Sequence, residues 1–182
     1  MSEGRIVVGV DIGTSKIATL IARVDEAVNV LGVSEVVSKG IRKGQIVDIK
    51  AAVEAITISL DQAERMAGYS ISRVVVSMGG SHIESQNSRG VVAVASPQGE
   101  ITSNDLARVI DAARAISLSS TREIIHVLPR NYIVDGQEGI KDPIGMMGVR
   151  LEVETHIITA NSVTLRNQEK AFSQIGIDVD GV

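Results

Sequence analysis

One apolar run near the start of the chain constrains the fold more than any other feature. Residues Ile6-Val7-Val8-Gly9-Val10 are β-branched and apolar apart from one glycine. A run of this kind is typical of a strand that is covered on both faces. Two further β-branched stretches, Ile17 to Val24 and Val28 to Val37, follow after short connections. The opening of the chain therefore predicts a meander of three strands.

The spacing of apolar residues changes after Asp48 from strand-like to helical. Apolar side chains recur every three or four residues from Ile49 to Ala67, which predicts an amphipathic helix. Asp48 is placed to cap the start of this helix, and Gly68 is placed to end it. A strand over Ile71–Met78 follows. The order β-β-β-α-β predicts an α/β lobe with a mixed sheet and helices.

From residue 81 to residue 159 the pattern differs and predicts a second, smaller α+β unit. It contains a strand candidate over Gly90–Ala95, a capped helix that begins near Thr102, and strands over Glu123–Val134 and Val149–Ile158. The stretch between the last two strands follows neither regular period. We interpret this region as an insertion into the first lobe.

The end of the chain returns to the first lobe. A helix is expected from Asn161 or Ser162, and Ile177–Val182 begins a strand. We therefore assign residues 1–80 and 160–182 to an incomplete first lobe, and residues 81–159 to the insertion. A terminal strand normally continues into more sheet, because its backbone groups would otherwise be unpaired. We expect the chain to be part of a longer protein.

Composition argues against several classes of function. There are 18 Lys+Arg against 22 Asp+Glu, a net charge of −4, and only three aromatic residues, which disfavours nucleic acid as a partner. The absence of cysteine excludes disulfides, thiolate metal sites and thiol catalysis. The three histidines show no metal-ligand spacing. No apolar run reaches the roughly 20 residues of a spanning helix, and no signal peptide is visible, so a cytoplasmic chain is expected.

The segment Asp11-Ile12-Gly13-Thr14-Ser15-Lys16, between the first two strands, carries the candidate chemistry. Gly13 allows the backbone to approach a ligand. The hydroxyls of Thr14 and Ser15 and successive N–H groups can donate to phosphate oxygens, and Lys16 can neutralise charge. Asp11 is placed to hold a water on Mg²⁺. The alternative is a plain hairpin turn, since Asp and Gly are common turn residues.

The wider context favours the phosphate interpretation. A first strand that ends in Asp-Ile-Gly-Thr-Ser, followed by a hairpin return, a third strand and a helix, resembles the first phosphate motif of the superfamily of actin, sugar kinases and heat-shock ATPases. Within that superfamily the chain resembles the FtsA family of cell-division proteins. The resemblance is carried by segments along the whole chain: Gly32–Ser34, Lys39–Gly44, Asp61–Ala67, Met78–Ile83, His126–Pro129, Gln137–Gly145, Gly148–Leu151 and His156–Thr159.

The resemblance implies an actin-like lobe of the ribonuclease-H type that carries an inserted, SHS2-like subdomain. It also implies binding of ATP with Mg²⁺ in the complete protein, at most weak ATPase activity, and no catalytic residue in this part. Asp11, Gly13, Thr14, Ser15 and Lys16 are the implied phosphate-side residues, with Asp11 bound to Mg²⁺ through water. Since a nucleotide cleft in this superfamily needs two lobes, this chain alone is expected to bind ATP weakly or not at all.

The partners are likewise implied by the resemblance. Members of the family polymerise and link FtsZ filaments to the inner membrane at the division site, where they help to assemble the Z ring and the divisome. The region that docks FtsZ and a C-terminal membrane helix would lie beyond residue 182, whereas the insertion would contact later division proteins. The implied location is the cytoplasmic face of the inner membrane.

Two other functions within the same superfamily remain open at this stage. One is a phosphotransferase similar to sugar kinases, although a kinase would lack the segment Gln137–Pro143 of the insertion. The other is an actin-like protein of type IV pilus assembly.

Two surface features also have alternative interpretations. The charged residues Arg108, Asp111, Arg114 and Arg122 form either a docking face or an ordinary solvated helix surface. The pair Met146-Met147 is either a protein contact or part of the packing of its own loop.

Overall fold

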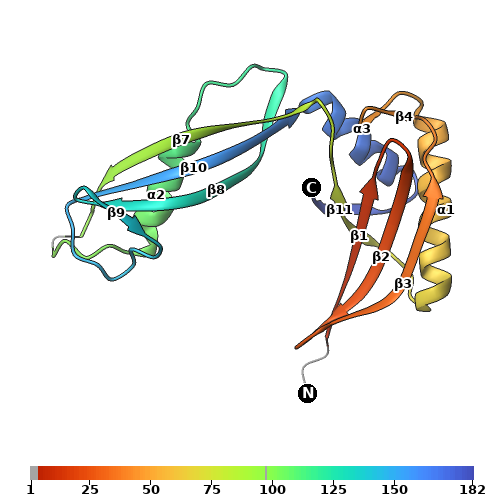
Figure 1. Cartoon of the computed structure of the whole chain (residues 1–182), viewed down its shortest axis with the longest axis horizontal. Helices are drawn as coiled ribbons and strands as arrows, with labels where there is room; N and C mark the ends of the chain where they lie inside the picture. Colours follow the sequence, from red (N-terminus) through yellow and green to blue (C-terminus); the bar gives the residue numbers. More distant parts are fainter. Residues whose placement is uncertain (1–3, 97) are drawn as a thin grey trace. The chain divides into compact units, whose positions relative to one another are not determined.

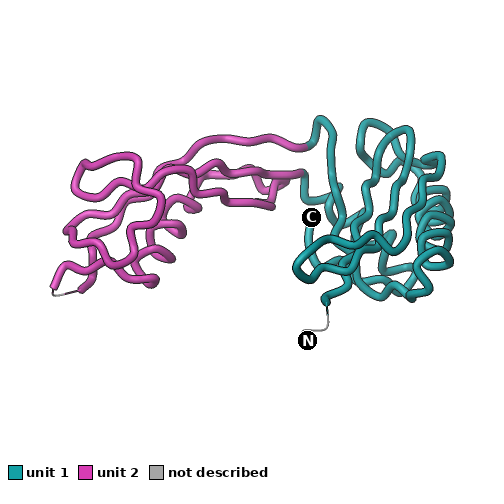
Figure 2. The backbone as a smooth tube through the Cα atoms, turned by 60° about the horizontal axis from the view of Figure 1, so that its bottom comes forward, with its two compact units in different colours: residues 1–82, 161–182 teal, residues 83–160 magenta. Residues whose placement is uncertain are grey.

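The computed structural model describes residues 4–96 and 98–182, and it divides the chain into two compact units (Figure 2). Unit 1 contains Met1–His82 and Asn161–Val182, and unit 2 contains Ile83–Ala160. The sequence placed these divisions after residues 80 and 159. Each unit has its own sheet and its own hydrophobic core.

Unit 1 is built on a five-stranded sheet in the order β11-β6-β1-β2-β3 (Figure 1). Strand β1 is antiparallel to β2 and parallel to β6. The opening meander and the mixed α/β fold are thus confirmed. The elements are β1 (Arg5–Ile12), β2 (Lys16–Val24), β3 (Val28–Val37), β4 (Ile41–Arg42), β5 (Gln45–Ile46), α1 (Ile49–Ala67), β6 (Arg73–Ser77), α3 (Ser162–Ser173) and β11 (Asp178–Gly181).

Helix α1 begins and ends where its sequence predicts. Asp48 caps it, because its Oδ1 accepts a hydrogen bond of 3.1 Å from the N–H of Ala51. Gly68 ends it with a left-handed φ of 63°, a conformation that glycine adopts without steric cost. Helices α1 and α3 pack on the same face of the sheet, where Ile17, Ile56 and Phe172 are fully buried.

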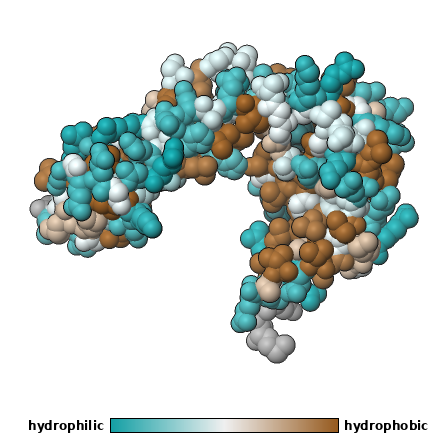
Figure 3. Space-filling view, viewed as in Figure 1, coloured by the Kyte–Doolittle hydropathy of each residue, from teal (hydrophilic) through white to brown (hydrophobic). Residues whose placement is uncertain are grey.

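The opposite face of this sheet is apolar and has no helix over it within the described residues. Gly9, Ala18, Leu20, Val33 and Val75 line a groove of about 470 Å³ there. Figure 3 shows apolar side chains gathered over β1, β2 and β3 on this side. Leu20, Val33 and Val75 are 41%, 49% and 46% exposed.

Unit 2 has a four-stranded sheet in the order β7-β10-β8-β9, with one helix, α2, on one face (Figure 1). Two of its strands differ from the expectation. Strand β7 begins at Ile83 rather than at Gly90, and β9 lies inside the stretch expected to be irregular. The elements are β7 (Ile83–Ala93), α2 (Ser103–Arg114), β8 (Arg122–Val134), β9 (Gln137–Ile140) and β10 (Arg150–Asn161).

Helix α2 is held by a capping box and by a close approach to the sheet. The hydroxyl of Thr102 accepts from the N–H of Asp105, whose carboxylate accepts from the N–H of Thr102 at 3.0 Å. A Cβ at Gly90 would lie 2.1 Å from the carbonyl oxygen of Val109, so only glycine allows α2 to lie this near to β7. Among the described residues no helix is long and apolar enough to cross a membrane.

Candidate functional site

A groove of about 460 Å³ opens in unit 1 where two parallel strands end. Asp11 near the end of β1 is paired in register with Ser77 at the end of β6, and ligands of α/β proteins bind at this edge of a parallel sheet. Three loops complete the walls of the groove. Its lining residues are Asp11, Ile12, Gly13, Thr14, Lys43, Gly44, Ser77, Gly79, Gly80 and Ser81.

The turn between β1 and β2 forms the first wall. The N–H of Gly13 donates to the carbonyl oxygen of Lys16 at 2.9 Å and closes the turn, so this N–H is already used within the chain. The hydroxyl oxygen of Thr14 accepts from the N–H of Gly44 at 3.2 Å. Because a hydroxyl can donate while it accepts, the Thr14 O–H still has a proton to offer to a ligand.

The second wall is formed by two glycine-containing segments in backbone contact. A Cβ at Gly44 would lie 1.7 Å from the carbonyl oxygen of Gly79, and a Cβ at Gly80 would lie 2.5 Å from that of Lys43. Gly44 and Gly80 also have positive φ angles of 74° and 142°. Only glycine satisfies both conditions, so these residues are needed to shape the groove.

The structure brings three of the five implied phosphate residues to the groove. Asp11, Gly13 and Thr14 line it, whereas Ser15 and Lys16 do not. The ammonium of Lys16 lies 2.8 Å from the carboxylate of Glu35 on β3. The hydrogen bond and the charge of Glu35, and to a lesser extent the charge of Asp11, raise the pKa of Lys16.

The donor set of the groove fits a phosphate ligand better than a directly bound metal. Its lining residues include one acidic residue, Asp11, one basic residue, Lys43, and three hydroxyl residues, Thr14, Ser77 and Ser81. In the part of the chain that the structure describes, no cluster of three or more His, Asp or Glu side chains could hold a metal ion. A cation that reached Asp11 together with phosphates would therefore need the phosphate oxygens and waters as its other ligands.

Sequence reasoning missed the residues of the second wall. Strand β6 follows β3 and α1 in the chain but pairs with β1, parallel to it, and this pairing brings Ser77 and Gly79-Gly80 to the end of β1. The right-handed rule for such a connection fixes its hand and not the neighbour of the new strand. Lys43 and Gly44 form the turn of a hairpin whose strands, β4 and β5, have two residues each. Strands of that length are too short for an apolar period to be recognised.

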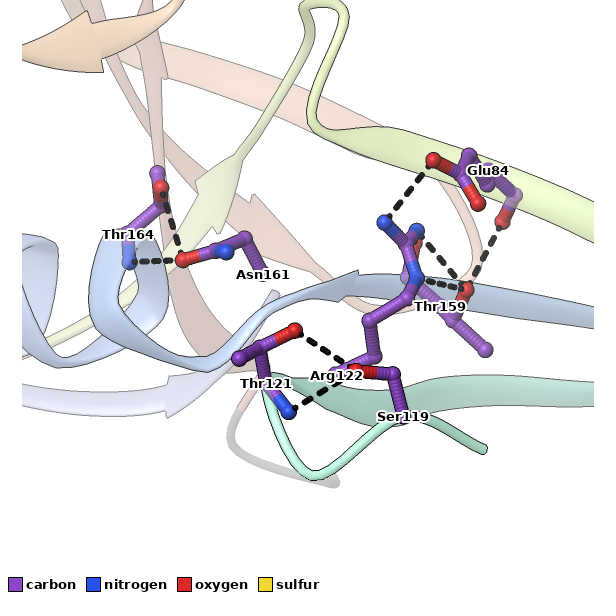
Figure 4. A network of polar contacts seen from close by, with 7 residues as sticks. All are labelled: Glu84, Ser119, Thr121, Arg122, Thr159, Asn161 and Thr164. Atoms are coloured by element: carbon purple, nitrogen blue, oxygen red, sulfur yellow. Dashed lines mark hydrogen bonds and ion pairs between the residues drawn. The ribbon is translucent and has the colours of Figure 1, made fainter. Parts of the chain in front are cut away.

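The charged residues around α2 form internal ion pairs in two cases. Arg108 lies 3.0 Å from the buried Asp105. Figure 4 shows the guanidinium group of Arg122, at the start of β8, between Glu84 of β7 and Thr159 of β10, with an ion pair of 3.0 Å to Glu84. Arg108 also donates to the carbonyl oxygen of Ala93 on β7 at 3.2 Å, so each of these two arginines joins elements of unit 2.

The two methionines of the loop before β10 differ. Met146 packs against the core of unit 2, whereas Met147 is 64% exposed. Met147 is therefore the more accessible of the two to a protein partner.

Similarity to known proteins extends over nearly the whole chain. Three proteins named Cell division protein FtsA are 45% identical in Borreliella burgdorferi, 38% in Pseudomonas aeruginosa and 36% in Escherichia coli. The alignments cover 97%, 100% and 98% of this chain, but only 43%, 44% and 43% of those proteins. The chain thus spans less than half the length of these relatives.

A family model and a solved structure complete the comparison. The family described as SHS2 domain inserted in FTSA matches residues 80–159, which correspond closely to unit 2. A chain of the PilM-PilN type IV pilus biogenesis complex has a TM-score of 0.65 at 12% identity and covers 97% of this chain and 46% of that one, which shows a shared fold. The chain therefore belongs to the FtsA family of cell-division proteins and carries that family's inserted SHS2 domain.

Proposed function

We propose that this chain forms part of an actin-like, ATP-binding adaptor that links FtsZ filaments to the inner membrane during cell division. The observation that carries this proposal is the 36% to 45% identity, along almost the entire chain, with proteins named Cell division protein FtsA. The similarity to the pilus biogenesis chain is one of fold at 12% identity, so it does not favour a pilus function. The insertion, which includes the segment Gln137–Pro143 that a sugar kinase would lack, argues against a phosphotransferase.

In this proposal the groove of unit 1 receives the phosphates of ATP. The Thr14 hydroxyl donates to a phosphate oxygen, and the backbone of Gly79-Gly80 allows the phosphates to approach closely. Asp11 holds a water on the Mg²⁺ ion that accompanies the nucleotide. When bound, Mg-ATP would bring its negatively charged phosphates and the Mg²⁺ ion, and the residues of the groove would orient both.

The proposed partners follow from family membership. We propose that the complete protein associates with itself, with FtsZ and with the inner membrane, and that unit 2 contacts later proteins of the divisome. It would then act at the cytoplasmic face of the membrane, at the division site, in assembly of the Z ring.

The experiment uses the complete protein and a single charge change. Asp11→Ala should weaken Mg-ATP binding by at least about tenfold, because a charge-assisted contact is lost. Asp61→Ala, which removes an exposed carboxylate from α1, is the matched control. Calorimetry measures both affinities. An unchanged affinity in the Asp11 variant would remove this groove from the nucleotide site.

The adaptor role is tested separately by co-sedimentation. The complete protein should carry FtsZ filaments to vesicles of inner-membrane lipids, and vesicles without the protein should not bind them. Binding to pilus assembly proteins in place of FtsZ would favour the pilus function.

A further inference from the structure

We propose that Lys43, rather than Lys16, supplies the positive charge that binds the phosphates of the nucleotide. This inference rests on the proposed function and assigns a role to a residue that the phosphate motif does not contain. Among the described residues that line the groove, Lys43 alone carries a positive charge and Asp11 alone carries a negative one. A groove for a polyphosphate needs such a cation, since Asp11 by itself would repel the ligand.

Lys16 is poorly placed for this task. Its ammonium lies 2.8 Å from Glu35, which belongs to the neighbouring strand β3, and both side chains are more than half exposed. Lys16 does not line the groove. It would have to leave its partner and turn toward the phosphates, whereas Lys43 already lies at the groove.

The backbone of Lys43 is fixed in an uncommon conformation. Lys43 and Gly44 are the two residues between β4 and β5, with φ angles of 51° and 74°. Two positive φ angles are typical of a type I′ hairpin turn, in which Asn, Asp or Gly is preferred at the first position. Strained positions of this kind cluster at functional sites, so a lysine here suggests selection for its side chain.

The turn is also tied to both walls of the groove. The N–H of Gly44 donates to the Thr14 hydroxyl at 3.2 Å. Gly44 and Lys43 approach the backbone of Gly79 and Gly80 so closely that no side chain fits between them. The backbone of Lys43 is thereby held in place while its side chain is exposed. Because this backbone is already ordered, less conformational freedom is lost when the ammonium group binds a phosphate.

This placement predicts a specific selectivity. A lysine ammonium is a compact charge with three donors and binds phosphate oxygens. Adenosine carries no phosphate and therefore offers no oxygen of this kind to the ammonium group. Lys43 should therefore contribute to the affinity for ATP and ADP and not to the affinity for adenosine.

The test compares three variants of the complete protein. In Lys43→Asn the charge is removed, but the new residue is one that type I′ turns prefer, so the fold should be retained or slightly stabilised. Lys39→Gln neutralises an exposed lysine of the neighbouring connection, between β3 and β4, that does not line the groove, and it serves as the matched control. Lys16→Gln tests the rival residue. Affinities for Mg-ATP, Mg-ADP and adenosine are measured by calorimetry, together with the melting temperature of each variant.

We expect Lys43→Asn to weaken ATP and ADP binding by about 10- to 100-fold, with an unchanged affinity for adenosine and an unreduced melting temperature. Lys39→Gln and Lys16→Gln should change the ATP affinity by less than about twofold. Unchanged ATP binding in the Lys43 variant, an equal loss for ATP and adenosine, or a larger loss in the Lys16 variant would each overturn the assignment. If the unmodified protein binds adenosine and ATP equally or not at all, the proposed function fails, and the role of Lys43 fails with it.

Discussion

The two sheets of this chain differ in the face that their helices leave uncovered. In unit 1 that face presents Leu20, Val33 and Val75 around an apolar groove. In unit 2 the alternation along β10 places Leu151 and Val153 toward α2, and therefore turns the residues between and after them to the other side. That side carries charge.

The uncovered face of unit 2 is organised by ion pairs. Glu152 is almost fully buried between two arginines, with its carboxylate 2.7 Å from Nε of Arg89 and 3.0 Å from Arg150. Arg89, Asn87, Arg130 and Glu154 line a shallow polar groove on this sheet. An antiparallel sheet with one polar face is stable in water, so unit 2 needs no further layer.

The uncovered face of unit 1 differs from that of unit 2 because it is apolar. Contiguous exposed apolar patches of this kind mark interaction surfaces. Unit 2 is therefore complete as a domain of two layers, one sheet and one helix. The sheet of unit 1, in contrast, has an apolar face suited to contact with another protein surface. Three substitution experiments test this contrast.

The largest effect is expected from substitutions that separate the two cores. Phe172→Ala should destabilise unit 1 by about 3–5 kcal/mol, and Leu151→Ala should destabilise unit 2 by about 2–5 kcal/mol, because each leaves a cavity in a different core. Hydrogen exchange in increasing urea, followed by mass spectrometry, measures each unit separately. Each variant should lower protection in its own unit only. If either substitution lowers protection in both units together, they form one cooperative domain and the contrast fails.

Local signals explain which parts of the fold could be predicted. The caps Asp48, Gly68, Thr102 and Asn161 act on backbone groups within four residues, so sequence reasoning placed α1, α2 and α3 closely. Strand β7 could not be placed in the same way. Its first half, Glu84-Ser85-Gln86-Asn87-Ser88-Arg89, is polar and forms a strand because it pairs with β10, more than sixty residues away.

The candidate site also combines residues that local sequence identifies with residues that only the fold brings to the groove. Asp11, Gly13 and Thr14 belong to one turn, and their residue types were sufficient to identify it. Lys43 and Gly79 reach the groove only because β6 pairs with β1 and a short hairpin packs on the loop that follows β6. Contacts between distant segments of this kind leave no period in the sequence.

An intermediate effect is expected from the buried carboxylate that caps α2. The hydroxyl of Thr102, at 2.7 Å, is the main cause that lowers the pKa of Asp105, followed by the N–H groups of Thr102 and Ala95 and the charge of Arg108. A lowered pKa in the folded state stabilises unit 2 above the ordinary carboxyl pKa of about 3.9, and this stability is lost as the pH falls through the lower value.

Asp105→Asn should therefore destabilise unit 2 by about 1 kcal/mol at pH 7 and reduce its loss of stability in acid. Asp111→Asn removes an exposed charge from the same helix and is the control. Urea unfolding of unit 2, measured by hydrogen exchange at pH 7 and at acid pH, gives both values. An acid dependence of unit 2 that is the same in the Asp105 variant would show that other carboxylates control it.

Substitutions on the two uncovered faces should change stability least, and they test the contrast most directly. Leu20 in unit 1 and Val91 in unit 2 are 41% and 45% exposed, so Leu20→Glu and Val91→Glu should each change the free energy of unfolding by less than about 0.5 kcal/mol. Their surroundings differ, because Leu20 lies in a continuous apolar groove and Val91 follows Arg89 on a charged face. Leu20→Glu should therefore reduce the binding of a hydrophobic dye to the chain and reduce its self-association in light scattering, whereas Val91→Glu should alter neither. Equal effects of the two variants would mean that dye binding and self-association depend on the exposure of single residues and not on a continuous apolar patch. Unit 1 would then need no covering layer.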